Sequence, residues 1–316
     1  MTGGDSKRLT IFFLSVLVAT AAFSHLHRTY SQKFFDVTGR AQWIWAQHRM
    51  AANEPLAFFA SRDFDLPEHR VYTHLKVLGD PEYTLYVNGR EVAGRLVDPN
   101  NRTIDLYDIS ELVKHKGNRI VIAVRSPQGV GGLIASIDIA PETENWIVTN
   151  QDWTIHRRWS ADLLARDTSD SWPERPLIIG EPPIGRWNYL EVAQRAHAAA
   201  ATSLLAPRTA TEMMGLIPVI RTQQGIAVAG SEKARATAFD FGFTQGHARL
   251  RIDADRPLSR AINVRFANAQ EELGLLESNM RPIVFAPGEH VVTTPEVHSF
   301  RYMMVFAKSV HAEVVK

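Results

Sequence analysis

The chain has 316 residues, of which 45% are hydrophobic and 22% are charged, a composition typical of a globular protein of about two domains. Lys and Arg number 35 against 34 Asp and Glu, so the net charge of +1 provides no basic field for nucleic acid. The absence of cysteine excludes disulfides, thiolate nucleophiles and zinc–thiolate sites.

A basic pair and an apolar run open the chain. Lys7 and Arg8 precede residues 9–23 (LTIFFLSVLVATAAF), an order typical of a secretory signal. The run is short for a membrane span, which needs about 20 apolar residues, and small residues at 22–24 (AFS) offer a cleavage site. We therefore predict that residues 1–33 form a signal peptide or a membrane anchor. The mature protein is expected in the periplasm, on the membrane or outside the cell.

Residues 34–160 are predicted to form a first β-sandwich, because short alternating or apolar segments recur there with turn signals between them. Residues 120–124 (IVIAV) are continuously apolar, as in a strand covered on both faces. The predicted strands are AQWIWA (41–46), EPLAFFASRDFDL (54–66), HRVYTHLKVLG (69–79), RTIDLYDISELV (102–113), RIVIAVRS (119–126), GGLIASIDIA (131–140) and NWIVTNQDWTIH (145–156).

A hairpin is predicted within this region. Residues 83–87 alternate between the two faces of a strand, and Asn88 and Gly89 follow at once. Asn and Gly both accept a positive φ, which a tight hairpin turn requires. The return strand is expected to start at Arg90.

Residues 161–211 are predicted to link the two halves of the chain. Residues 167–189 are rich in Pro, Gly and polar residues, which favours a long ordered loop. Residues 191–206 (EVAQRAHAAAATSLLA) are strong helix formers that end before Pro207, so we predict a short connecting helix.

Residues 212–316 are predicted to form a second β-sandwich, which makes the chain all-β behind its N-terminal helix. The expected strands are GLIPVIRT (215–222), GIAVAG (225–230), ATAFDFGF (236–243), HARLRID (247–253), AINVRFAN (261–268), HVVTTP (290–295) and FRYMMVFAKSVHAEVV (300–315).

The order of these motifs resembles the N-terminal, non-catalytic β-sandwich domains of bacterial α-L-rhamnosidases. The resemblance implies that the first sandwich is a galactose-binding-like jelly roll. In the first half it rests on AQWIWA, FFASRDFDLP, YTLYVNGREVAG, IDLYDISELVKHKGNRIVIAV and IVTNQDWTI, and in the second half on AFDFGFTQGHARLRI, AINVRFANAQEEL and HSFRYMMVF.

The chain also departs from the pattern of that family. After Asp-Phe-Gly (240–242) the family usually has Gln-Asn and later a Trp, whereas this chain has FTQGHA at 243–248. Near Asn268 the family usually has an acidic residue. The family's catalytic carboxylates lie in an (α/α)₆ barrel whose motifs are not found here, so we expect no catalytic residue.

The acids of the second half are expected to have structural roles. Glycoside hydrolysis needs two carboxylates flanking the scissile bond, and no cue places a pair of these acids in a cleft: Asp240, Asp253, Asp255, Glu271 and Glu272. No motif predicts a cofactor or a metal site.

Tryptophans are the strongest ligand candidates, because large aromatic rings can stack on the C–H faces of sugars. Those that lie in the strand pattern are predicted to be core: Trp43, Trp45, Trp146 and Trp153. The others lie in or near the long loop and, with two charged neighbours, are predicted to form a shallow carbohydrate-binding patch: Trp159, Asp170, Trp172, Arg186 and Trp187. The alternative role of these rings is to pack the loop onto the sandwich.

The sequence therefore predicts an exported, non-catalytic carbohydrate-binding or accessory protein, whose partner is a polysaccharide or glycan. Residues 1–33 would add the membrane as a partner if they are not cleaved. One alternative is a subunit or truncated form of an α-L-rhamnosidase-like glycoside hydrolase, which needs a separate catalytic (α/α)₆ barrel. A second alternative is a structural envelope protein without a ligand.

Overall fold

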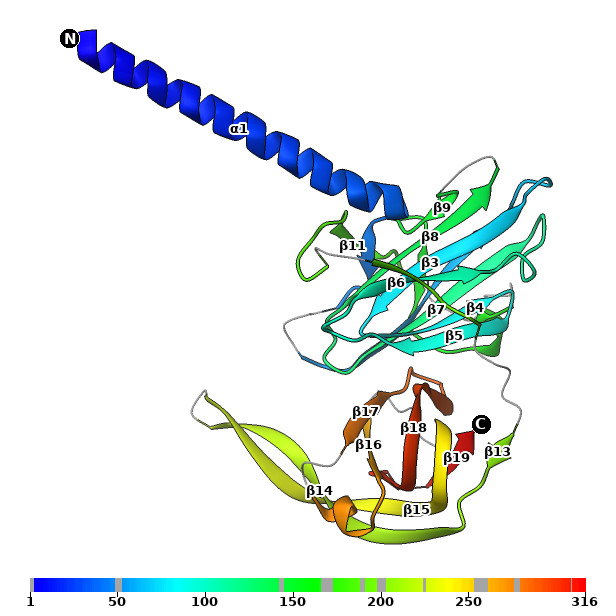
Figure 1. Cartoon of the computed structure of the whole chain (residues 1–316). Helices are drawn as coiled ribbons and strands as arrows, with labels where there is room; N and C mark the ends of the chain where they lie inside the picture. The colour runs from blue at the N-terminus through cyan, green and yellow to red at the C-terminus, as the bar shows by residue number, and fades with distance from the viewer. Residues whose placement is uncertain are drawn as a thin grey trace.

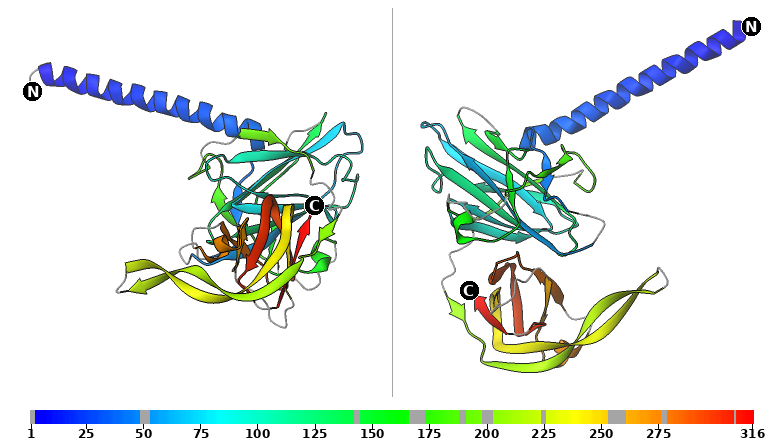
Figure 2. Two further views of the ribbon diagram at one scale, coloured as in Figure 1. Left: turned by 60° about the horizontal axis from the view of Figure 1, so that its bottom comes forward. Right: turned by 180° about the vertical axis from the view of Figure 1, so that it is seen from behind.

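The computed structural model describes residues 3–48, 53–141, 145–165, 173–187, 191–197, 203–223, 226–252, 261–275, 279–307 and 309–316. One long helix leads into two β-rich bodies, and Figures 1 and 2 show the second body packed against the first on the side away from the helix. The predicted fold class is confirmed: the chain is mostly β-strand, in two antiparallel β-sandwiches behind an N-terminal helix.

Helix α1 (Gly3–Thr38) is continuous over 36 residues. Among the described residues, its segment Ile11–Thr38 is long and apolar enough to cross a membrane, and none of its most apolar window is buried. Its last turn is packed on the first sandwich, where Phe34 and Thr38 are buried. Lys76 Nζ donates a hydrogen bond of 2.6 Å to the Val37 carbonyl, which fixes the end of the helix to the sandwich.

The first sandwich consists of two sheets. One has the strand order β10 (Thr154–His156), β2 (Leu56–Phe64), β7 (Asn118–Ser126), β4 (Glu82–Val87) and β5 (Arg90–Leu96). The other has the order β11 (Leu177–Gly180), β1 (Trp43–Trp45), β8 (Gly132–Ala140), β3 (Tyr72–Asp80), β6 (Thr103–Asp108) and β12 (Glu191–Gln194), with β9 (Ile147–Val148) beside β8.

The core of the first sandwich lies between these sheets and contains Trp43, Trp45 and Trp153, as predicted. The β4–β5 hairpin is confirmed as well, because Asn88 and Gly89 have φ angles of 50° and 81°. Trp146, by contrast, is 41% exposed, so its assignment to the core was wrong. Its indole Nε1 donates to the Asp65 carbonyl at 3.0 Å while the ring lies on the surface.

The predicted connecting helix is wrong where the chain is described. Residues Glu191–Gln194 form strand β12, which pairs in parallel with β6 and extends the sheet of the first sandwich. A short alanine-rich helix gains little by itself in water, whereas the edge of a sheet offers a complete row of hydrogen bonds. The predicted loop likewise contains strand β11, which pairs with β1.

The second sandwich is built from one seven-stranded sheet that bends around its core (Figure 1). Its order is β13 (Leu204–Leu205), β19 (Val310–Val315), β15 (Ile226–Ile252), β18 (Val291–Val305), β16 (Ala261–Ala267) and β17 (Met280–Val284), with β14 (Thr209–Gln223) paired to β15. Three predicted strands are thus parts of β15 alone. The short helices η2 (Ala161–Leu163) and η3 (Glu271–Gly274) lie outside the sheets.

The two sandwiches meet through apolar and charged contacts. Phe59 and Val121 of the first sandwich pack in one buried cluster with Val284 of the second. Arg125 donates to the Val284 carbonyl at 3.1 Å and forms a buried ion pair with Glu289. Burial alone would lower the pKa of Arg125, but the neighbouring carboxylates raise it above its ordinary value. These apolar and charged contacts hold the two sandwiches in a defined relative orientation.

Candidate functional site

The loop patch predicted from the sequence is only partly described. Arg186 and Trp187 both interact with Asp80, through an ion pair of 3.1 Å and an indole hydrogen bond of 2.8 Å. The Trp187 ring is only 6% exposed and stacks on Trp43, with 4.3 Å between the ring centroids. This ring therefore closes the sandwich and presents no open face.

The other members of the predicted patch lie elsewhere or outside the description. Trp159 is half-buried and packs on Phe59, with 5.5 Å between the ring centroids, next to the interface with the second sandwich. Asp170 and Trp172 lie outside the described residues. The carbohydrate-binding patch as a whole stays a prediction.

A groove on the second sandwich has the geometry of a ligand site. It has a volume of about 690 Å³ and runs along β15 and β18. Its lining includes an exposed phenyl ring, two side-chain amides and two residues with hydroxyls: Phe243, Gln245, Asn268, Thr244 and Ser299. We call it the Phe243 groove. The Phe243 side chain is 77% exposed, which is unusual for a large aromatic residue in a strand.

A β-bulge holds Phe243 out of the sheet. Asp240 pairs with Tyr302 and Thr244 pairs with Phe300, so residues 241–243 lie opposite Arg301 alone. Gly242 within the bulge has a φ of +68°, a conformation that favours glycine. Bulges of this kind redirect side chains and are frequent beside functional sites.

Polar contacts of Asp240 stabilise the bulge. Asp240 accepts a hydrogen bond of 2.7 Å from the Gly242 amide and pairs with Arg301 at 3.2 Å. These hydrogen bonds lower the pKa of Asp240. The Arg301 guanidinium lies 5.9 Å from the centroid of the Phe243 ring, so the ring is supported on one side. Asp240 thus contributes to the geometry of the bulge, while its assignment as a non-catalytic residue stays a prediction.

The polar groups of the groove are suited to a neutral, hydroxylated ligand. The Thr244 hydroxyl is buried and has no hydrogen-bond partner within the described part of the chain. Amides and hydroxyls donate and accept at once, as sugar hydroxyls require. Among the acids of the second half, Glu272 accepts a hydrogen bond of 2.9 Å from the backbone N–H of Asn268. Asp253 and Asp255 lie outside the described residues.

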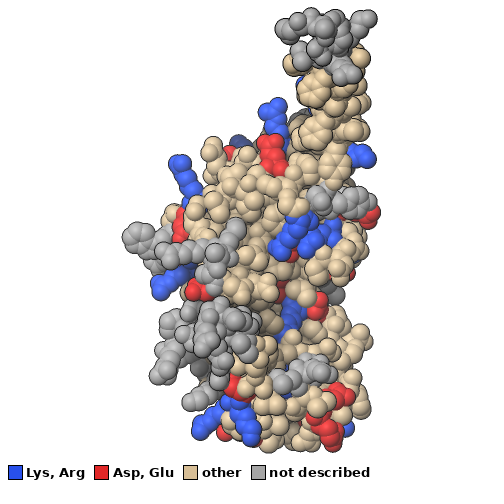
Figure 3. Space-filling model, turned by 90° about the vertical axis from the view of Figure 1, so that its left-hand side faces the viewer, with Lys and Arg blue, Asp and Glu red and all other residues tan. Residues whose placement is uncertain are grey.

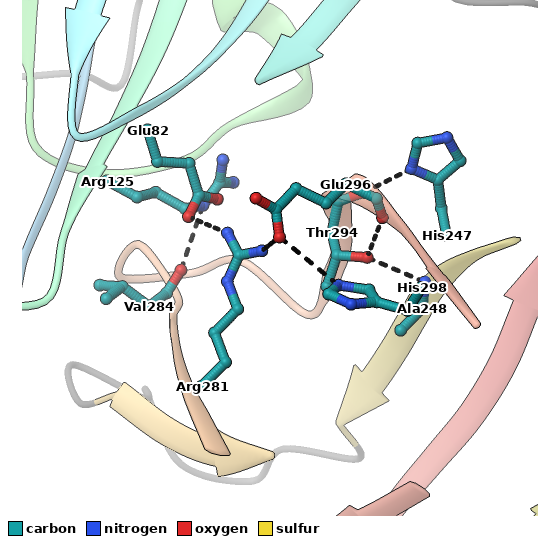
Figure 4. A network of polar contacts seen from close by, with 9 residues as sticks. All are labelled: Glu82, Arg125, His247, Ala248, Arg281, Val284, Thr294, Glu296 and His298. Atoms are coloured by element: carbon teal, nitrogen blue, oxygen red, sulfur yellow. Dashed lines mark hydrogen bonds and ion pairs between the residues drawn. The ribbon is translucent and has the colours of Figure 1, made fainter. Parts of the chain in front are cut away.

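A network of polar contacts secures the groove to the first sandwich (Figure 4). Arg281 on β17 bridges Glu82 of the first sandwich at 2.8 Å and Glu296 of the second at 2.9 Å. The Thr294 carbonyl and hydroxyl, on β18, contact His247 and the Ala248 amide of β15 at 2.8 and 2.9 Å. The wall of the groove next to the first sandwich is therefore held in one conformation.

Sequence reasoning missed the Phe243 groove, although its signals were present. Phe243, Gln245, His247 and Asn268 all lie in segments where the chain departs from the rhamnosidase pattern, and the fold brings all four to the groove. A glycine inside a strand pattern is a known sign of a bulge, and Gly242 is such a residue. The pairing of β15 with β18 was needed to show that these positions share one surface.

No protein-family model and no curated protein sequence matches this chain. Solved structures do match it in fold. Over 87% of its length it is similar to the α-L-rhamnosidase of Dictyoglumus thermophilum, with a TM-score of 0.52 and 16% identity. The chain has a rhamnosidase-like fold. The resemblance inferred from the motifs is therefore confirmed at the level of fold.

Two further rhamnosidases agree with this. The family GH78 rhamnosidase of Bacillus sp. GL1 has a TM-score of 0.51 at 13% identity, and the α-L-rhamnosidase of Aspergillus terreus has 0.51 at 12%, each over 87% of this chain. The chain spans only 35%, 55% and 36% of the length of these three enzymes. At such identities the likeness concerns the fold alone.

Proposed function

We propose that this chain is a carbohydrate-binding protein and that its glycan lies in the Phe243 groove. The observation that carries the proposal is the exposed Phe243 ring, which a β-bulge holds out into the groove beside the side-chain amides of Gln245 and Asn268. An aromatic ring with adjacent amides and hydroxyls offers a sugar both an apolar face and hydrogen bonds. On the face shown in Figure 3, basic and acidic side chains are interspersed, without a large field of one sign.

The test is titration of the full chain in detergent against a panel of rhamnose- and galactose-containing glycans. An exposed groove with one stacked ring is expected to give millimolar to micromolar binding, about 4 to 8 kcal/mol. Phe243→Ala should weaken binding at least tenfold and leave the melting temperature unchanged. Val71→Ala, at a valine that is 76% exposed on the first sandwich, is the matched control. Binding that survives Phe243→Ala at full strength would move the ligand elsewhere, first to the predicted Trp159–Trp187 patch.

A second candidate is that of an accessory subunit of an α-L-rhamnosidase-like glycoside hydrolase, which acts with a separate catalytic barrel. It is supported by the rhamnosidase-like fold and by the share of the whole enzymes that this chain spans, which is 35% and 55% of the length of two rhamnosidases. The purified chain alone should hydrolyse no aryl rhamnoside. Turnover that disappears when one of its own carboxylates is replaced would refute the non-catalytic part of the proposal. If the chain binds none of the glycans in the panel, the alternative of a structural envelope protein without a ligand is favoured.

We further propose that the chain is exported and tethered by α1. A helix of 36 residues is about 54 Å long, whereas the hydrocarbon core of a bilayer is about 30 Å thick. The remaining turns reach the sandwich, on which Phe34 and Thr38 are buried. A reporter that is active only after export, fused to residues 1–40, tests the export. Edman sequencing of the purified protein then distinguishes an intact anchor from a cleaved signal.

A further inference from the structure

A second cavity adjoins the Phe243 groove. It has a volume of about 410 Å³ and lies between the two sandwiches. The groove and this interdomain cavity share two lining residues, His247 and Val315. Each volume falls within the range of roughly 300–1,000 Å³ typical of small-ligand sites, so together they have room for more than one sugar unit.

His247 stands at the junction with one ring nitrogen available. Its Nδ1 lies 2.8 Å from the Thr294 carbonyl, and a carbonyl can only accept, so Nδ1 carries the proton. The Nε2 of the neutral ring is then a hydrogen-bond acceptor. Figure 4 shows the second ring nitrogen directed away from Thr294, and none of the described residues hydrogen-bonds to it. This nitrogen can accept from a ligand hydroxyl that passes between groove and cavity.

The first sandwich contributes a matching wall. Tyr86 and Glu91, from the β4–β5 hairpin, line the cavity. Burial, followed by the nearby Glu91 carboxylate, raises the pKa of Tyr86, so its hydroxyl remains a donor at any physiological pH. No described residue hydrogen-bonds to this hydroxyl. Burial also raises the pKa of Glu91, which Arg125 and His247 oppose.

The charges in the cavity are balanced. The lining contains two arginines, Arg125 and Arg249, and two glutamates, Glu91 and Glu289. Arg125 and Glu289 neutralise each other in a buried pair. A site with balanced charge and an unpartnered hydroxyl suits a neutral, hydroxyl-rich group over an acidic one.

We propose that the glycan continues from the Phe243 groove past His247 into the interdomain cavity, so that the ligand is a neutral oligosaccharide held by both sandwiches. This inference rests on the proposed function and gives the class of its ligand. One sugar ring stacks on Phe243, and the next units hydrogen-bond to His247 Nε2, the Tyr86 hydroxyl and the Glu91 carboxylate.

The experiment is calorimetric titration of the full chain in detergent with L-rhamnose, with D-galactose and with oligosaccharides of two to six units built from them. Affinity should rise at least about tenfold from the single sugar to three units. Tyr86→Phe and Glu91→Gln should each weaken the oligosaccharide about five- to tenfold and leave binding of the single sugar unchanged. Tyr72→Phe, on the other sheet of the first sandwich, is the matched control.

Two results would overturn the inference, and only the second would also overturn the proposed function. If Phe243→Ala abolishes binding while Tyr86→Phe and Glu91→Gln leave the oligosaccharide affinity unchanged, the groove binds alone and the proposed function stands. If no saccharide of any length binds the wild-type chain, the proposed function fails and the inference fails with it. Unchanged melting temperatures of the Tyr86 and Glu91 variants confirm that a loss of affinity is not a loss of fold.

Discussion

The first sandwich directs most of its tryptophans and several carboxylates inward, whereas the second holds a phenylalanine ring out in solvent. In the first, Trp187 stacks on Trp43 and donates to Asp80, which two arginines also contact. In the second, Phe243 is 77% exposed beside a hydroxyl that has no partner in the described chain. Both arrangements are supported by Arg–Asp pairs, but of these two rings only Phe243 presents an open face to solvent.

The difference shows that aromatic content alone does not locate a binding surface. The first sandwich has more large rings, yet most of them are buried in its core. A buried ring contributes stability and offers a ligand no open face, whereas an exposed ring on a rigid frame can stack on a ligand. Four predictions measure how far this contrast between the sandwiches extends.

The largest effect is expected at Asp105 in the first sandwich. Its carboxylate is fully buried and contacts Arg95, Arg195 at 2.8 Å and the Tyr83 hydroxyl at 2.5 Å. Asp105→Ala leaves two arginines without their counter-charge and should lower the free energy of unfolding by about 3–5 kcal/mol. Urea denaturation measures this.

The control for Asp105 is Asp152→Ala, which removes an exposed pair with Arg62 at 3.5 Å. Exposed pairs of this kind contribute about 0–1 kcal/mol. Equal losses in the two variants would contradict the contrast between buried and exposed charges.

Trp187→Ala should cost about 3 kcal/mol of stability, since truncation leaves a cavity beside Trp43. Gly132 allows the ring this close approach: a Cβ there would lie 2.6 Å from the Trp187 ring. Glycan affinity should not change once the variant is folded. Thermal melting and glycan titration on the same sample measure the stability and the affinity. A loss of affinity at an unchanged melting temperature would contradict the prediction and indicate that Trp187 contacts the ligand.

Each sandwich also contains a histidine whose pKa burial lowers from its ordinary 6.5 to about 4: His156 in the first and His298 in the second. Arg119 beside His156 and Arg281 beside His298 account for part of this lowering of the pKa. Between pH 6.5 and 4 the unfolded chain binds more protons than the folded one, so stability should fall as the pH decreases through this window.

Because both rings are partly screened by solvent, the loss is expected to be on the order of 1–2 kcal/mol for each histidine. Urea denaturation of His156→Gln and His298→Gln between pH 4 and 7 separates the two contributions. His298 lies in the polar network at the interface, so its variant should also weaken the pH dependence of oligosaccharide binding. Stability that is flat between pH 4 and 6.5 in the wild type would contradict the prediction.

The smallest effect is expected at Asp240. Asp240→Ala removes the contacts to Gly242 and Arg301 and should weaken glycan binding two- to fivefold, because the Phe243 ring is then less firmly placed. Asp240 is half-buried and its partner Arg301 has an exposed side chain, so solvent screens the pair and stability should change by less than about 1 kcal/mol. Asp240→Asn retains an acceptor for the Gly242 amide and should fall between the wild type and Asp240→Ala. Identical affinities in all three proteins would show that the bulge does not position the ring.

Much of the fold follows from local sequence. Strand alternation and the Asn88–Gly89 pair specify the β4–β5 hairpin, because turn chemistry and the face of each side chain depend on neighbours in the chain. The core roles of Trp43 and Trp153 follow from the same periodicity. Trp146 lies in a similar pattern and is nevertheless exposed, since a short strand at the margin of a sheet need not have a covering layer.

What the sequence determined by itself is the all-β character, the apolar N-terminal helix and the order of motifs that resembles rhamnosidases, all of which depend on periodicity and local chemistry. Only the tertiary structure decided that residues 191–194 form a strand, that Trp187 is covered and that Phe243 is exposed. The tertiary structure also places His247 of the second sandwich and Tyr86 of the first in the lining of one cavity. Such features depend on which distant segment completes a hydrogen bond or covers a ring, and no local pattern records the identity of that segment.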